Sequence, residues 1–321
     1  MNEGAFALAE VDGGNLCAHP ELGPPDPHYK LMTAADIVAF GIDLDGRHTT
    51  NSGTPEKGSC AHDDFRGVGD RSGIDNQMAR VVGCDGAGEQ YAAADESGDL
   101  PSGESGVSEM MLQGGWAVLV VLRDLDSYES DDHVEVGLYA SADPIVLSVK
   151  REAIPYATYA SDLDARFRGD THGRIVDGVL ITEPVDVRFH WLVAGLHLER
   201  PLKNARLEVT FNEDGGLQGY LAGYTPVEAM YDINYGFRSA VTDTGEPAPE
   251  KMKRVLSVLG NSVMGRTCHG AYAALYRFAD ADPDPVTGRC RSISTQYWIR
   301  ATPAFVVDVE THGVNDALMS P

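Results

Sequence analysis

Two acidic loops carry the side chains best suited to bind a metal ion. Asp43 and Asp45 alternate in the first loop, and Asp280, Asp282 and Asp284 alternate in the second. Carboxylates at alternate positions of a turn can direct their oxygens to one point, where a hard cation such as Ca²⁺ would bind them. Neither loop has the complete pattern of an EF-hand, so aspartates that only cap turns in water are the competing interpretation.

Two further acidic segments, residues 62–64 and 70–76, could add ligands near the first loop. The chain has 49 acidic and 25 basic side chains and a net charge of −24. Such a charge repels nucleic-acid phosphates and anionic membrane surfaces, which argues against nucleic acid as a partner and suits divalent cations wherever carboxylates converge. Solvation of the surface in a saline habitat would explain the same acidity without a metal.

The cysteines indicate a disulfide framework. Cys60 and Cys84 flank one Gly- and Asp-rich loop, and Cys268 and Cys290 flank another, as expected of cysteines that close loops. No CxxC spacing or nearby HxxxH accompanies either pair, which argues against zinc. We therefore predict the disulfides Cys60–Cys84 and Cys268–Cys290. Cys17 is left over as a free thiol, a partner for another chain, or a tether.

The expected location follows from the same cysteines. Residues 1–14 lack the basic start and apolar core of a signal peptide, which leaves either a cytoplasmic protein or a mature exported form. Paired cysteines favour the exported form, in the periplasm, at the cell surface or secreted. No apolar run reaches the roughly 18 residues that a membrane-spanning helix needs, so no membrane span is expected.

Alternation of apolar and polar residues between positions 133 and 224 predicts strands with one face on the core and one face outside. An outer face of this kind can bind a sugar, because aromatic rings stack on the sugar and polar groups bond its hydroxyls. The candidate ligand-binding residues are His133, Tyr139, Arg188, Gln218, Tyr220 and Tyr224. A wet face without a ligand is the simpler alternative, because antiparallel sheets commonly leave one face in water.

Catalysis on the same face is a second possibility. Glu135 and Glu208 could act as acid and base on a glycosidic bond if about 5 to 10 Å separated them, and His190 is the histidine assigned to this chemistry. No GxSxG, GxGxxG, Walker or HExxH motif supports another reaction.

The elements that must position these residues are mostly strands. They are expected at 36–42, 116–122, 133–140, 187–193, 206–212 and 218–224, with a return within 292–309. Apolar residues at helical spacing predict a short helix at 74–82 and longer helices at 249–264 and 268–279. This order predicts a mainly β protein, an antiparallel β-sandwich of jelly-roll type with a small C-terminal helical insertion. The expected organisation is a flexible leader (1–35), the sandwich with long acidic loops (36–245), and helices with returning strands packed on it (246–321).

These patterns together favour an exported β-sandwich binding protein, stabilised by two disulfides and Ca²⁺, whose polar sheet face binds a glycan or another extracellular ligand. A polysaccharide hydrolase or lyase that uses the carboxylates of the sheet face is one alternative. A structural surface-assembly protein, in which the acidic loops bind Ca²⁺ and the sheet contacts a partner, is the other.

Overall fold

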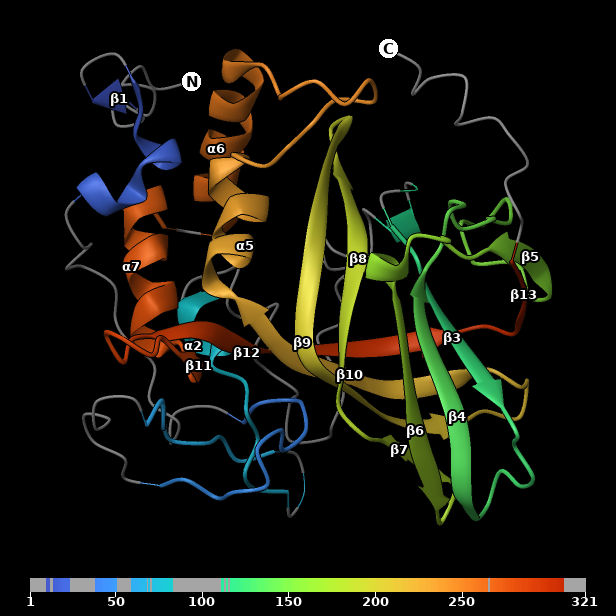
Figure 1. The fold of residues 1–321 in the computed structure, drawn as a ribbon. Helices are drawn as coiled ribbons and strands as arrows, with labels where there is room; N and C mark the ends of the chain where they lie inside the picture. The colour runs from blue at the N-terminus through green and yellow to red at the C-terminus, as the bar shows by residue number, and fades with distance from the viewer. Residues whose placement is uncertain are drawn as a thin grey trace.

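A large antiparallel sheet, with a group of helices beside it, forms most of the fold (Figure 1). The computed structural model describes residues 10–11, 14–23, 38–50, 59–67, 69, 71–82, 111–112, 114, 116–264 and 266–308. The strands are β1 (Glu10–Val11), β2 (Gly14–Asn15), β3 (Val118–Arg123), β4 (Asp131–Ala140), β5 (Ala157–Ala160), β6 (Arg168–Val176), β7 (Val179–Thr182), β8 (Val185–Val193), β9 (Leu196–Phe211), β10 (Leu217–Pro226), β11 (Ala281–Pro283), β12 (Cys290–Ala301) and β13 (Ala304–Val307). The α-helices are α2 (Met78–Val82), α5 (Val227–Tyr231), α6 (Glu250–Met264) and α7 (Cys268–Phe278). Shorter turns of helix are η1 (Leu16–Ala18), η2 (Pro20–Leu22), η3 (Ala165–Phe167) and the π-helical η4 (Asp232–Gly236).

The main sheet has nine strands in the order β11-β12-β10-β9-β7-β6-β4-β3, and β8 pairs with β9 beside this path. Strand β9 passes through a left-handed residue, Asn204, with a φ of 48°, and its register against β10 shifts nearby. The first part of β9 pairs with β8 and the last part with β7, so the sheet folds over on itself. The prediction of a mainly antiparallel, β-sandwich-like fold is therefore confirmed.

The core lies where β8 packs across β4 and β6. Val187, Phe189 and Trp191 of β8 are buried, as the sequence alternation predicted. On the facing strand β4, Val134 and Leu138 are completely buried. Burial of these apolar side chains from both layers is the main favourable contribution to folding.

The helices lie at one end of the sheet, next to β12 (Figure 1). Helices α6 and α7 occupy the two C-terminal spans that the sequence predicted. The short elements η1 and η2 lie against α7, and Cys17 of η1 is completely buried. The part of the predicted flexible leader that the structure describes at 14–23 is therefore packed on the fold. None of the described helices is long and apolar enough to cross a membrane.

The two disulfides connect different partners from those expected. They join Cys17 to Cys268, with Cα atoms 5.3 Å apart, and Cys60 to Cys290, with Cα atoms 5.7 Å apart. The predicted pair Cys268–Cys290 is wrong, and so is the pairing of Cys60 with Cys84, which lies outside the described residues. The physical reason is that Cys268 begins α7, on which η1 packs, whereas Cys290 begins β12. Each bond ties a segment from the N-terminal third to the C-terminal part of the chain.

The predicted strand at 36–42 is also wrong over the residues that the structure describes. Val38 forms an isolated bridge with Arg66, and the following residues form a loop. This loop holds the first acidic motif.

Candidate functional site

The first acidic loop, residues 39–46, lies on the sheet over β10 and β12. Ile42 and Leu44 are buried, and they pack in one cluster with Tyr224 of β10. Gln296 of β12 bonds the backbone of Ile42 twice, because its Oε1 accepts from the N–H (3.2 Å) and its Nε2 donates to the carbonyl (3.0 Å). The apolar residues of the loop thus hold it on the sheet and leave the aspartates on either side of Leu44 more exposed.

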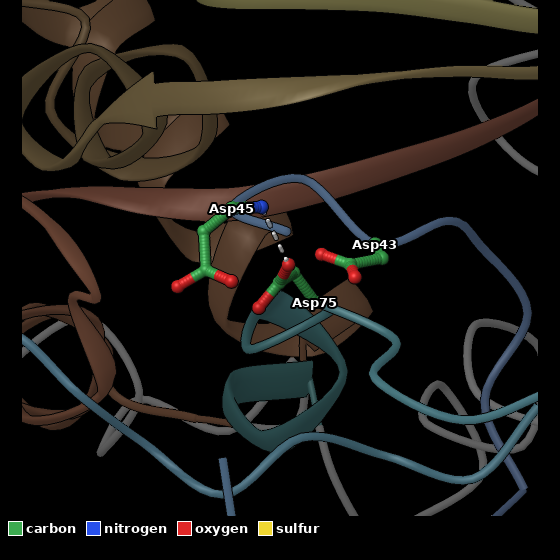
Figure 2. Close-up of side chains that lie close together, drawn as sticks. All are labelled: Asp43, Asp45 and Asp75. Carbon is green, nitrogen blue, oxygen red and sulfur yellow. Dashed lines mark hydrogen bonds between the residues drawn. The ribbon is translucent and has the colours of Figure 1, made fainter. Parts of the chain in front are cut away.

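Three carboxylates from two segments converge beside this loop. Figure 2 shows Asp43, Asp45 and Asp75, which each place one oxygen within 4.8 Å of the others. Asp75 comes from the segment before α2 and is buried, and its Oδ2 accepts N–H bonds from Leu44 (2.7 Å) and Asp45 (3.3 Å). Asp43 accepts from the N–H of Gly46 at 2.7 Å. Backbone donors therefore fix the directions of these carboxylates.

Burial and mutual repulsion raise the pKa values of carboxyl groups in and around this triad. The pKa of Asp75 rises to about 8, first through burial and then through the charges of Asp280 and Asp45. Burial, with the charge of Asp45 added, raises the pKa of Asp280 to about 7. The pKa of Asp64 rises to about 6, again mainly through burial, with the charges of Asp45 and Asp43 added. Carboxyl groups are thus crowded here, and ionising all of them together is unfavourable.

A divalent cation bound by the triad would relieve this crowding. The cluster offers only carboxylate oxygens, with neither histidine nor cysteine among its described members, which is the donor set of Ca²⁺ or Mg²⁺ and not of zinc. Backbone hydrogen bonds hold the three carboxylates, which come from the acidic loop and from the segment before α2. These residues therefore fit a hard cation. They would supply part of the roughly six to eight oxygens that Ca²⁺ requires, and water or backbone carbonyls would supply the rest.

The second acidic loop contributes only its first aspartate to this region. Asp280 interacts electrostatically with Asp45 and Asp75. Asp282 instead forms ion pairs with Lys203 (3.0 Å) and Arg291 (3.1 Å), which lower its pKa.

Asp284 caps a turn through the N–H and hydroxyl of Thr287, and these bonds lower its pKa. The expectation that Asp282 and Asp284 are free to bind a metal is therefore not supported, because cations and turn donors already occupy them. Asp75 was missed as a named ligand, although it falls in the 70–76 segment that the sequence marked as a source of ligands.

The polar face of the sheet is present, and it includes an aromatic residue outside the predicted set. Glu208 of β9 pairs across the strands with Tyr220 of β10, and Tyr220 pairs with Trp298 of β12. On the neighbouring rung, Gln218 of β10 pairs with Arg300 of β12. Trp298 is 42% exposed, so its ring is open to solvent. Alternation within the strand predicted at 292–309 was the signal that could have identified it.

Two of the three predicted stacking tyrosines are covered. Tyr139 is 2% exposed, and the guanidinium of Arg168 lies 4.3 Å from its ring centre. Tyr224 is 8% exposed because the acidic loop packs on it. This burial contradicts the expectation that all three rings are open for stacking. Of the three tyrosines, only Tyr220, which is partly buried beside Trp298, can still contact a ligand.

The remaining candidates are spread over the outer face. His133 of β4 is exposed and its ring stacks on that of His172 at 4.7 Å. Arg188 of β8 forms an ion pair with Glu199, and His190 bonds Asp162 at 2.7 Å through its Nε2. The structure does not bring these residues together with the β10–β12 pair.

The proposed acid and base are far apart. Glu135 is on β4 and Glu208 is on β9, with β6 and β7 between them. Three steps of about 4.8 Å place them about 14 Å apart, which exceeds the separation of glycosidase carboxylates. Glu208 also forms an ion pair with Arg71. This geometry does not favour Glu135 and Glu208 as a catalytic pair.

Arg71 connects the acidic loop to the polar face. Its Nη1 donates to the carbonyl of Gly41, at the start of the loop, at 3.1 Å. Its guanidinium also pairs with Glu208 and lies 5.6 Å from the ring centre of Tyr220. The position of the loop therefore affects the surface around Tyr220.

No protein-family model matches the chain, and neither curated proteins nor solved structures give a significant match to it. This is a mainly antiparallel β protein with two disulfides and a partly buried aspartate triad that could hold a metal ion.

Proposed function

We propose that the protein is an exported binding protein in which Ca²⁺ fixes the acidic loop on the sheet, and the adjacent outer face binds a glycan. The observation that carries this proposal is the convergence of Asp43, Asp45 and Asp75 on a loop that packs against β10. An ion at this point would tie the loop to the segment before α2 and neutralise charges that otherwise oppose each other.

The disulfides support export. Bonds of this kind form and persist in oxidising compartments and are rare in the cytosol, where thiols are kept reduced. Both bonds join segments more than 200 residues apart, with sequence separations of 251 and 230 residues. They are therefore suited to a structural role, since they restrict a large part of the unfolded chain.

The choice of a glycan is supported by the groups around Trp298. An exposed indole beside Tyr220 offers a surface on which a sugar ring can stack. Gln218 and Arg300 on the next rung, together with Glu208, offer donors and acceptors for hydroxyl groups. Because Arg71 links this surface to the loop, removal of Ca²⁺ should weaken sugar binding as well as stability.

A binding screen tests the proposal. Purified protein is applied to a panel of neutral and acidic polysaccharides in 1 mM Ca²⁺ and in EDTA. We expect retention by at least one polysaccharide in Ca²⁺, and roughly tenfold weaker binding for Trp298→Ala and Tyr220→Ala, as for the loss of an interface anchor. Tyr156→Ala is the matched control, because Tyr156 is 62% exposed and lies away from this rung. Binding that is unchanged in the two β10–β12 variants, or absent from the whole panel, would contradict the glycan assignment.

A further inference from the structure

A buried arginine lies in an aromatic cage inside the sandwich. Arg200 of β9 is 4% exposed, with Leu198 and Leu202 buried on the same side of the strand. Its guanidinium lies 4.4 Å from the ring centre of Trp191 and 5.1 Å from that of Tyr297. Trp116 completes the cage, 5.9 Å from the guanidinium.

Three residues of this cage have buried donors that bond no acceptor in the part of the chain that the structure describes. Among the described residues, Nε and Nη1 of Arg200 are buried without a hydrogen-bond partner, and the same is true of the indole Nε1 atoms of Trp116 and Trp191. Guanidinium and indole groups can donate but cannot accept, so these residues cannot satisfy one another. No carboxylate among the described residues forms an ion pair with Arg200 either. The chemical group that this cluster requires is an acceptor, and the positive charge favours an anion.

Other buried arginines of the chain show how a guanidinium is normally satisfied. Arg80 is 7% exposed and donates to the carbonyl of Asp63 at 2.7 Å. Arg266 is 5% exposed and donates to the carbonyl of Val81. Buried polar groups are almost always bonded in this way, and a buried unpaired charge is strongly unfavourable. Arg80 also lies near two aromatic rings and has an unbonded buried Nε, but it keeps a carbonyl acceptor. No acceptor of this kind bonds the side chain of Arg200 among the described residues.

We propose that this cage binds a small monovalent anion, of the size of chloride or formate, which accepts N–H bonds from Arg200 and from the indoles of Trp116 and Trp191. Small size is required because protein interiors are closely packed. The site lies on the core side of β9 and does not depend on the aspartate triad. The anion proposal can therefore be tested independently of the calcium proposal.

Tryptophan fluorescence tests this site directly. The chain has three tryptophans, so Trp298→Phe leaves Trp116 and Trp191 as the reporters. Chloride, bromide or formate is titrated into this variant at constant ionic strength, with the much larger gluconate as the balancing anion. We expect a saturable change in fluorescence and a rise in melting temperature with each small anion and neither effect with gluconate alone.

Two variants in the same background distinguish the cage from other anion effects. Arg200→Met keeps an unbranched side chain but removes the donors, so the saturable response should disappear. Trp116→Phe keeps a ring and removes one N–H, so the dissociation constant measured through Trp191 should rise about tenfold. A response that persists in Arg200→Met, or that gluconate reproduces, would overturn the proposal, as would the absence of any saturable response to the three small anions.

Discussion

Replacement of Asp75 by asparagine separates the metal-binding role of this residue from its structural role. The amide keeps an oxygen that can accept the N–H bonds from Leu44 and Asp45, and its NH₂ group can donate to the neighbouring carboxylates of the triad. The substitution therefore preserves the shape of the site but removes the carboxylate that a metal ion would bind. Metal-free protein should tolerate the change, whereas metal-bound protein should lose a ligand.

The pKa of Asp75 sets the size of the effect. The unfolded chain ionises this group near 3.8, but the folded protein holds the proton up to about pH 8. Stability of the metal-free protein therefore falls as the pH rises from about 4 to about 8, and the penalty at pH 7 is about 4 kcal/mol. The uncharged amide of the variant carries no such penalty. In EDTA, Asp75→Asn should be at least as stable as wild type, although loss of a buried acid is ordinarily destabilising.

Calcium should reverse this order. At a concentration one hundred times its dissociation constant, Ca²⁺ would stabilise wild type by about 2.7 kcal/mol, or a rise in melting temperature of about 5 °C. The variant should show little of this gain. Thermal melts of both proteins at pH 7, in EDTA and in millimolar Ca²⁺, provide the comparison.

Asp232→Asn is the matched control. Asp232 is 6% exposed against 5% for Asp75, and it also accepts backbone N–H bonds, from Arg238 and Ser239. Asp232 differs because Arg238 provides a cation, so its replacement should destabilise the protein equally with and without Ca²⁺. If Asp75→Asn behaves like this control, with the same loss of stability in both conditions, then Asp75 does not bind Ca²⁺.

Calcium binding at pH 7 should release protons, because the pKa values of Asp75 and Asp280 are raised to about 8 and about 7. The apparent affinity for Ca²⁺ should therefore rise between pH 6 and 8 and level off above pH 8. Calorimetry in buffers of different ionisation enthalpy measures the proton release, and its absence would contradict this prediction. Non-reducing peptide mapping should identify Cys17–Cys268 and Cys60–Cys290, and a Cys268–Cys290 peptide would contradict the observed pairing. In denaturant titrations, Cys60→Ser should lower the free energy of unfolding by about 4 kcal/mol.

Local pattern was sufficient to predict the strands with clear alternation and the two long helices. It did not reveal β6, because the inward positions of that strand include Gly169 and Gly173. A side chain at Gly169 would collide with Val187, and one at Gly173 with Leu180 and the backbone of Ile181. These glycines make room for side chains of neighbouring strands, and they remove the apolar alternation from the sequence.

Contacts between distant segments were the main source of error. Both disulfides join segments whose separation in the sequence gives no sign of their proximity. The sequence predicted two of the three metal ligands for the same reason. Asp43 and Asp45 are close in one turn, whereas Asp75 reaches them through the packing of another segment. The open or buried state of Tyr224 likewise depended on the loop that covers it.

A crystal structure of protein grown in millimolar Ca²⁺ is the decisive test of calcium binding by the aspartate triad. We expect one strong density peak about 2.3 to 2.6 Å from carboxylate oxygens of Asp43, Asp45 and Asp75, with further oxygen ligands completing the shell. A structure in which these three carboxylates keep their positions at that calcium concentration, with only water or no density between them, would contradict it.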